Sequence, residues 1–231
     1  MGKRKAKNSD AKGASPAAVV PTSTLPPNLL AASTKHHTFG QIKTLAPGAV
    51  WVQSAFLSAK ECQALIDWSA PQWEYTAHQS TKYIAHRECF RIQRNDDNVA
   101  KALFARLQAS GLLNLVQKAL TLRSNYQPMA CNPNIRLYQY AKGMRFGKHV
   151  DGSDDTAVGQ TEITLLVYLS NCQGGATRFW QPHSSDEFAF VPEQGAILLH
   201  VHGDRCLEHA ADSVTAGTKY VLRSDVCYRY V

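Results

Sequence analysis

Residues 140–151 read Tyr-Ala-Lys-Gly-Met-Arg-Phe-Gly-Lys-His-Val-Asp, and this stretch decides how the rest of the sequence is interpreted. Side chains on a β-strand alternate between its two faces, so His149 and Asp151 project from the same face. A distant histidine, His209, can complete a triangle of metal ligands. Two imidazoles and one carboxylate on one side of an octahedral ferrous ion leave three positions open, whereas a closed structural zinc site leaves none. The pattern therefore favours a metal centre at which other molecules bind.

A second pair of histidines with the same spacing, His200 and His202, competes for this interpretation and is followed by Asp204. No residues around it match a ligand pattern, whereas those around His149 do. We therefore interpret His200 and His202 as core histidines and place the metal at His149, Asp151 and His209.

Four more motifs follow in order along the chain. They are Gly174-Gly-Ala-Thr177-Arg-Phe179, Pro192-Glu-Gln-Gly195, His209 itself, and Gly217-Thr-Lys219. Together with residues 140–151, this set resembles the prolyl 4-hydroxylase-like branch of the Fe(II)/2-oxoglutarate dioxygenases. That branch has the pattern Tyr-x-x-Gly-x-x-Phe/Tyr-x-x-His-x-Asp, Gly-Gly-x-Thr-x-Phe, Pro-x-x-Gly, and a histidine followed ten residues later by lysine. The resemblance covers residues 132–230.

Residue by residue, the resemblance makes His149, Asp151 and His209 the iron ligands and so the catalytic residues. Lys219 matches the cation that receives the distal carboxylate of 2-oxoglutarate, a role that suits an ammonium group. Tyr140 matches a tyrosine whose hydroxyl helps to hold this cosubstrate, and Thr177 is expected to be a further hydrogen-bond donor.

Arg223 is a further candidate for the cosubstrate site. On a regular strand, residues 219, 221 and 223 share one face, so Arg223 is expected beside Lys219. It would then assist or replace Lys219, or it would be a structurally paired arginine. The sequence leaves both interpretations open.

The resemblance implies an oxidoreductase that uses Fe(II) and 2-oxoglutarate, with ascorbate as a further cofactor that its relatives use. The expected reaction is hydroxylation of a protein or peptide side chain, as in prolyl hydroxylases, with release of succinate and CO2. Two features depart from the collagen-type enzymes: Thr161 and Glu162 lie where those enzymes carry an arginine for the peptide, and residues 219–226 lack their tryptophan.

Two alternative functions remain open on the same fold. A nucleic-acid dealkylase would fit the basic tail and the Tyr138-x-Tyr140 segment, but its paired arginines after the last histidine are missing. A non-catalytic jelly-roll binding module would be favoured if a ligand residue were absent, and all three are present.

Composition limits the organisation of the chain. With 231 residues and 44% hydrophobic content, the chain can bury one core. The six cysteines include no Cys-x-x-Cys pair, so we expect reduced thiols in the cytoplasm or nucleus. No run of about 18 apolar residues predicts a membrane helix. The sequence indicates no oligomeric state.

Residues 1–38 are predicted to form a disordered tail. Residues 1–12 carry five lysines or arginines against Asp10, which accounts for four of the seven net positive charges. The rest of the tail is rich in Ala, Ser, Pro and Thr, a composition that cannot pack a core. The basic cluster suits a nuclear address, a nucleic-acid contact or a simply solvated tail. The tail lacks the apolar segment of a secretory signal.

Residues 39–231 are predicted to form one globular domain, with helices and leading strands in residues 39–131 and a jelly-roll in residues 132–231. Three helices are expected, one after the capping box Ser58–Glu61, one after Asp96 and one over residues 112–119. Six short strands follow Pro133, from Ile135 to Tyr228. Helices followed by many short strands predict a mostly β fold, a double-stranded β-helix with supporting α-helices. Four aromatic residues are candidates for a substrate groove or for the core: Trp68, Trp73, Tyr75 and Tyr83.

Overall fold

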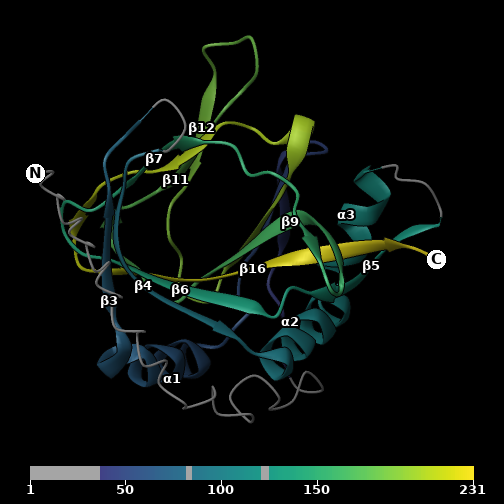
Figure 1. Cartoon of the computed structure of the whole chain (residues 1–231), viewed down its shortest axis with the longest axis horizontal. Helices are drawn as coiled ribbons and strands as arrows, with labels where there is room; N and C mark the ends of the chain where they lie inside the picture. The colour runs from purple at the N-terminus through teal and green to yellow at the C-terminus, as the bar shows by residue number, and fades with distance from the viewer. Residues whose placement is uncertain (1–36, 82–84, 121–124) are drawn as a thin grey trace, which may run out of the picture.

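Antiparallel strands wrapped into a nearly closed barrel make up most of the chain, with helices on one side (Figure 1). This computed structural model describes residues 37–81, 85–120 and 125–231. The arrangement confirms the predicted jelly-roll with supporting helices. The predicted tail, residues 1–38, lies almost entirely outside the described residues.

The strands of the larger sheet are hydrogen-bonded in the order β1-β2-β13-β9-β16-β6-β4-β7-β14-β11-β12, with β3, β5 and β8 attached to β4, β16 and β9. Their bounds are β1 Ile42–Ala46, β2 Val50–Gln53, β3 Glu74–His78, β4 Arg87–Asn95, β5 Tyr126–Cys131, β6 Asn134–Tyr140, β7 Phe146–His149, β8 Asp155–Thr156, β9 Gly159–Tyr168, β11 Thr177–Trp180, β12 Glu187–Phe190, β13 Ile197–Val201, β14 His209–Ala211 and β16 Lys219–Tyr230. Two further short strands, β10 Gln173–Gly174 and β15 Val214–Ala216, pair with each other.

The long strand β16 organises one wall of the barrel, because it pairs with β9 along one edge and with β6 and β5 along the other. The opposite wall consists of β7, β14, β11 and β12 (Figure 1). The two walls meet at β4 and β7 through a single register pair, Arg87 with Phe146. The interior of the barrel is therefore lined by residues from strands far apart in the sequence.

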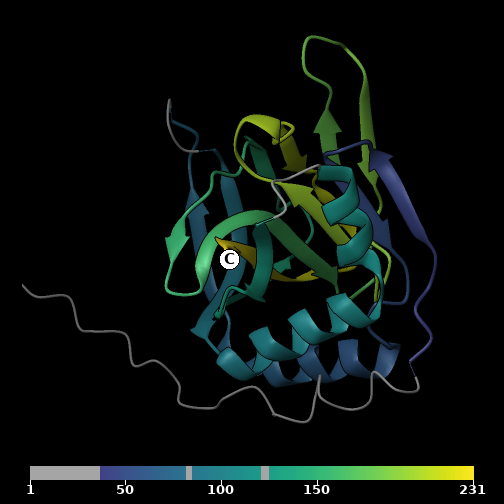
Figure 2. The same ribbon diagram turned by 90° about the vertical axis from the view of Figure 1, so that its right-hand side faces the viewer.

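The three predicted helices are confirmed as α1 Ala59–Ser69, α2 Asp97–Ala109 and α3 Leu112–Leu120. Helix α1 begins at a complete capping box, in which Ser58 and Glu61 each accept a hydrogen bond from the other's backbone amide. An ion pair connects α1 and α2. Arg106 of α2 is almost fully buried, and its guanidinium lies 2.6 Å from a carboxylate oxygen of Glu61 in α1. Figure 2 shows α1 and α2 lying together beneath the barrel.

The start of α2 depends on Asp96, whose carboxylate accepts hydrogen bonds from the backbone amides of Asn98 and Val99. Replacing Asp96 with alanine leaves these amides without that acceptor, so we expect the free energy of unfolding to fall by about 1 kcal/mol. Urea denaturation followed by circular dichroism measures the change. Replacing the exposed Asp97, which is inside the helix, is the matched control, and an equal loss in both variants would contradict the capping role.

The other sequence predictions have mixed outcomes. All six cysteines are free, four of them buried and two partly buried. Trp68 and Trp73 pack against the main core, Tyr75 is largely exposed, and Tyr83 lies outside the described residues. In the ranges that the structure describes, no helix has the length and apolar character needed to cross a membrane.

Candidate functional site

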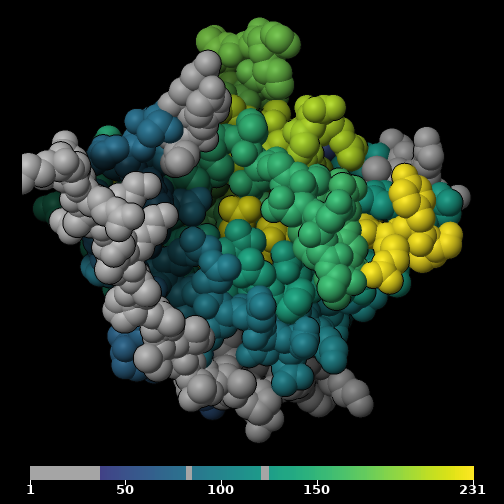
Figure 3. All heavy atoms as spheres, in the orientation of Figure 1, coloured from purple at the N-terminus to yellow at the C-terminus, as the bar shows by residue number. Residues whose placement is uncertain are grey.

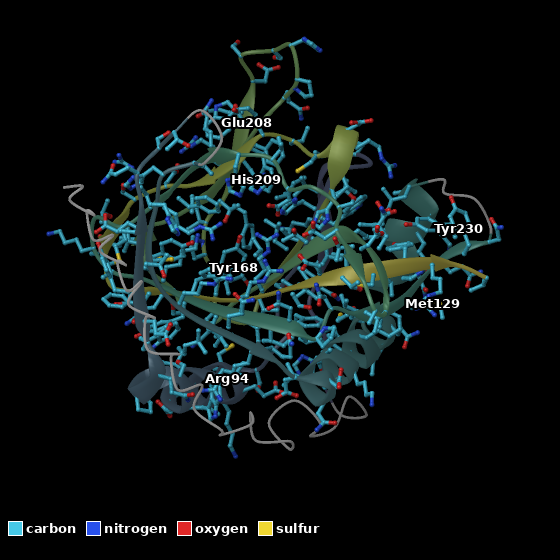
Figure 4. All side chains as sticks on the ribbon, viewed as in Figure 1. Arg94, Met129, Tyr168, Glu208, His209 and Tyr230 are labelled. Carbon is cyan, nitrogen blue, oxygen red and sulfur yellow. The ribbon has the colours of Figure 1, made fainter. Side chains whose placement is uncertain are left out.

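The three predicted metal ligands meet inside the barrel. His149 ends β7 and His209 begins β14, and these two residues are direct partners in the pairing of the two strands. One donor atom from each of His149, Asp151 and His209 lies within 4.8 Å of the other two. The Asp151 carboxylate lies 3.7 Å from Nε2 of His149 and 3.9 Å from Nε2 of His209. Figure 4 shows His209 in the interior of the molecule.

Backbone carbonyls orient both histidines. Nδ1 of His149 lies 2.9 Å from the carbonyl oxygen of Gly147, and Nδ1 of His209 lies 2.9 Å from that of Leu207. A carbonyl oxygen only accepts, so each Nδ1 carries the hydrogen and each Nε2 presents its lone pair towards Asp151. Burial lowers the pKa of His149 to about 3 and also lowers the pKa of His209. Both rings are therefore neutral at pH 7, as metal binding requires.

The carboxylate of Asp151 is fixed through one of its two oxygens. Oδ2 accepts hydrogen bonds from Oγ1 of Thr164 at 2.6 Å and from the Arg223 guanidinium at 2.9 Å. Burial acts to raise the pKa of Asp151, but Arg223, the neighbouring histidines and the Thr164 hydrogen bond together outweigh burial and hold this pKa well below its usual range. Asp151 is ionised at pH 7, and no described residue donates a hydrogen bond to its Oδ1. Two neutral imidazoles and one charged carboxylate fit a ferrous ion.

A pocket of about 480 Å³, counting the space at its open mouth, adjoins these residues. All seven residues predicted for the site line it: Tyr140, His149, Asp151, Thr177, His209, Lys219 and Arg223. Figure 3 shows a hollow in this face of the molecule, with yellow atoms of β16 between teal and green atoms. The barrel thus gathers into one pocket residues that are up to 83 positions apart, since Tyr140 and Arg223 both reach it.

Lys219 is a buried cation available to an anionic ligand in this pocket. Its ammonium group is buried and donates to the carbonyl oxygen of Gly175 at 2.7 Å, while no carboxylate of the described residues forms an ion pair with it. An ammonium group has three donors, so two remain for a ligand. Burial lowers the pKa of Lys219 to about 8. Thr177 lies nearby and shares a 2.7 Å hydrogen bond with the hydroxyl of Tyr168.

Arg223 shares the pocket with Lys219, as the alternation of β16 predicted. Its guanidinium, however, pairs with Asp151 at 2.9 Å and lies 3.5 Å from Asp225. Of the two roles left open by the sequence, this geometry favours the structurally paired arginine. Arg223 thus holds a proposed metal ligand in place.

Replacing Arg223 with glutamine is expected to weaken metal binding by roughly 10–100-fold, because an outer partner that orients a ligand is lost. Titration of the metal-free chain with Mn(II) measures this change. Arg136→Gln, which removes a different partner of Asp225, is the matched control. An unchanged Mn(II) affinity in Arg223→Gln would contradict the assigned role.

His200 lies at the site although the sequence analysis treated it as a core histidine. It is almost fully buried and lines the pocket, with Nε2 at 3.6 Å from the Asp151 carboxylate and no hydrogen-bond partner. His202 is instead satisfied by Thr164 and by the carbonyl of Thr161. No local pattern separates the two, because His200 lies in the fully buried strand β13 and His202, just after its end, is buried as well. Only the pairing of His200 with Thr164 on β9 places it beside Asp151.

Arg87 is a second residue that the sequence analysis missed. It begins β4 and lines the mouth of the pocket, where its guanidinium lies 3.7 Å from the centre of the Phe146 ring. Little in the sequence indicated that Arg87 belongs to the site, because it precedes the matched motifs by more than fifty residues.

Comparison with known proteins places the chain in a family. Residues 135–224 match the model of the 2OG-Fe(II) oxygenase superfamily, and this range contains all the candidate site residues named above except Arg87. The matched range, 90 of the 231 residues, has the features of a 2OG-Fe(II) oxygenase domain. The chain is a 2-oxoglutarate-dependent dioxygenase that uses Fe(II), and its donor set and its free lysine fit both cofactors. No curated protein matched its sequence.

Solved structures with similar folds include several prolyl hydroxylases. The viral collagen prolyl hydroxylase of Paramecium Bursaria Chlorella virus-1 has 19% identity and a TM-score of 0.53, over 77% of this chain and 95% of that one. A Pseudomonas putida prolyl-4-hydroxylase has 18% identity and a TM-score of 0.52, over 78% and 93%. A Trichoplax adhaerens prolyl hydroxylase in complex with a hypoxia inducible factor peptide has 16% identity and a TM-score of 0.55, over 78% and 84%. At these identities the likeness establishes the jelly-roll fold.

Proposed function

We propose that this dioxygenase hydroxylates a side chain of a protein or peptide, in the manner of a prolyl hydroxylase. His149, Asp151 and His209 hold Fe(II), and Lys219 receives the distal carboxylate of 2-oxoglutarate with Tyr140 and Thr177 beside it. One observation carries the proposal. Three potential ligand atoms lie within 4.8 Å of one another, and the same pocket contains the ammonium group of Lys219, which has no carboxylate partner among the described residues.

The cofactors supply the oxidising power: the substrate C–H becomes C–OH with one oxygen atom of O2, while 2-oxoglutarate takes the other and leaves as succinate and CO2. The residues of the chain hold and orient these groups. Thr164 and Arg223 fix Oδ2 of Asp151, and backbone carbonyls fix the two histidines. Leu166 and Val221 add apolar side chains to the lining of the pocket.

A peptide substrate is favoured over nucleic acid by the matched motifs and by the solved structures of similar fold, one of which contains a peptide. The dealkylase alternative calls for a paired-arginine signature after His209, whereas this chain carries Lys219 ten residues after that histidine in a different pattern. The binding-module alternative requires a defective ligand set, whereas all three donors are present and converge.

The test is incubation of the full chain with Fe(II), 2-oxoglutarate and O2, with succinate measured with and without proline-containing peptides. We expect Fe(II)-dependent succinate that rises with a substrate peptide, and a mass gain of one oxygen on that peptide. Turnover of 2-oxoglutarate stimulated by a methylated oligonucleotide and by no peptide would overturn the proposed substrate class. Asp151→Ala serves as the inactive control.

A further inference from the structure

We propose that Arg87 and Arg91 form an anion-binding subsite at the mouth of the pocket, which selects peptides carrying an acidic side chain close to the hydroxylated residue. This inference rests on the proposed function, because it defines which peptides the same site accepts.

The position of Arg87 links it to the metal centre. Its guanidinium stacks on the ring of Phe146 at 3.7 Å, and that ring stacks in turn on the imidazole of His149, with centroids 3.8 Å apart. A group bound to Arg87 would therefore lie one aromatic ring away from a proposed iron ligand. A substrate chain anchored there extends directly over the pocket.

Arg91 lies next to Arg87 on the same face of β4, since residues 87, 89 and 91 share parity on the strand. Both guanidinium groups lie over one ring, that of Tyr138, at 5.6 Å for Arg87 and 5.9 Å for Arg91. The Tyr138 ring is itself part of the pocket lining. The two cations therefore lie over one ring, and two members of this group, Arg87 and Tyr138, line the pocket.

Neither guanidinium is neutralised within the part of the chain that the structure describes. Other arginines find carboxylates: Arg106 pairs with Glu61, Arg178 with Asp212, and Arg223 with Asp151. Arg91 donates only to the side chain of Gln93, and the Nε atoms of both Arg87 and Arg91 are buried without an acceptor. Glu74, directly across from Arg91 in the strand pairing, forms no ion pair with it.

In the proposed site, neither carboxylate of 2-oxoglutarate is assigned to Arg87 or Arg91. One carboxylate of 2-oxoglutarate is assigned to the metal and the other to Lys219, while Arg223 neutralises Asp151. Arg87 and Arg91 then remain as two positive charges in a partly desolvated entrance, where an added carboxylate gains charge-assisted hydrogen bonds to planar guanidinium groups.

A peptide with an isolated acidic residue suits these two arginines better than a nucleic acid. The hairpin that carries Arg87 and Arg91 also carries Glu74 and Glu88 at its surface. Glu88 projects from the opposite face of β4, so a single carboxylate on the two arginines has only Glu74 as an acidic neighbour, whereas a phosphate at every nucleotide brings further negative charge next to both acids.

The test measures peptide binding to the full chain loaded with Fe(II) and 2-oxoglutarate under nitrogen, so that no turnover occurs. Fluorescent peptides carry one central proline flanked by glutamates, and their twins carry glutamine instead. The variants are Arg87→Gln, Arg91→Gln and the charge reversal Arg91→Glu. Arg94→Gln is the matched control, because Arg94 lies on the same strand but on the opposite face, over Trp68 near α1 (Figure 4).

We expect the glutamate peptide to bind the wild type at least roughly 10-fold more tightly than its glutamine twin, as a charge-assisted hydrogen bond would give. The preference should vanish in Arg87→Gln and Arg91→Gln and persist in Arg94→Gln. Arg91→Glu should reverse it in favour of a lysine-flanked peptide.

Equal binding of the two peptides, a preference that survives in both glutamine variants, no peptide binding at all, or tighter binding of a single-stranded oligonucleotide would each overturn the subsite. Admission of air then tests the proposed function separately. Arginine-dependent binding without a gain of oxygen supports the subsite and counts against hydroxylation of these peptides.

Discussion

Replacing Asp151 with alanine is expected to abolish both iron retention and succinate production. Asp151 is the one proposed ligand that carries charge, and its carboxylate lies between Nε2 of His149 and Nε2 of His209. Its removal leaves two neutral imidazoles, so metal affinity should fall by more than the roughly 10–100-fold that loss of an outer partner causes. Iron per chain after reconstitution, and the affinity for Mn(II), measure the effect.

Two controls separate this loss from unfolding and from an alternative metal site. Asp155→Ala removes an exposed carboxylate from the same segment and should retain wild-type iron. Circular dichroism should show that Asp151→Ala is folded, since Arg223 keeps Asp225 as a neighbour at 3.5 Å. Full iron retention in Asp151→Ala would contradict our assignment. It would point to the other group of converging donors, His200, Cys206 and His209, and to substitution of Cys206 as the next measurement.

Replacing Lys219 with methionine is expected to raise the dissociation constant of 2-oxoglutarate by roughly 10–100-fold. Methionine nearly preserves the length of the side chain but removes the charge, and a hydrogen bond to a charged group contributes about 1.5–3 kcal/mol. Because the ammonium group is buried, water does not replace it as a partner for the carboxylate. Isothermal titration with 2-oxoglutarate in the Mn(II)-loaded chain measures the change without turnover.

The affinity of the wild type for 2-oxoglutarate should depend on pH through the same residue. The pKa of Lys219 in the free protein is lowered to about 8, so the ammonium form that binds a carboxylate predominates below pH 8 and declines above it. Affinity should therefore be full below pH 8 and fall as the pH rises through this value. The bound carboxylate favours the charged form, which spreads the loss towards higher pH.

Lys219→Arg provides the matched control for this pH dependence, because a guanidinium keeps its charge throughout the range. The Arg and Met variants should both lose the decline above pH 8, the first because it stays charged and the second because it has no charge. A wild-type affinity that is constant from pH 7 to pH 10, or a Met variant that binds as well as the wild type, would contradict the role of Lys219.

Local patterns predicted a large part of this molecule. The capping box at Ser58 and the cap at Asp96 mark where α1 and α2 begin, because a helix start is decided by a few consecutive residues. Most strands after Pro133 could be predicted from the alternation of apolar and polar residues. The exceptions are short strands such as β7 and β14, which carry His149 and His209. Those strands are too short to show a period of their own.

The candidate site was predicted less evenly than the fold. Spacing along the chain pointed to His149, Asp151, His209 and Lys219, and the barrel gathers all four into one pocket. The role of Arg223 could not be predicted from the sequence. Whether it pairs with Asp151 or with a cosubstrate depends on which charged groups lie next to it in the folded barrel. Arg87 was missed for the same reason.

The sequence by itself determined the residue types of a metal centre, the starts of the helices and the strand-rich second half. Apart from His209, which is 58 residues after Asp151, these follow from spacings of ten residues or fewer. The tertiary structure alone decided that His200 and not His202 faces Asp151, and that Arg223 holds the carboxylate. It also decided that Arg87 and Arg91 lie over the Tyr138 ring with no carboxylate partner among the described residues. These outcomes depend on the register between strands distant in sequence. Register is set by how the whole barrel closes, and no single segment encodes it.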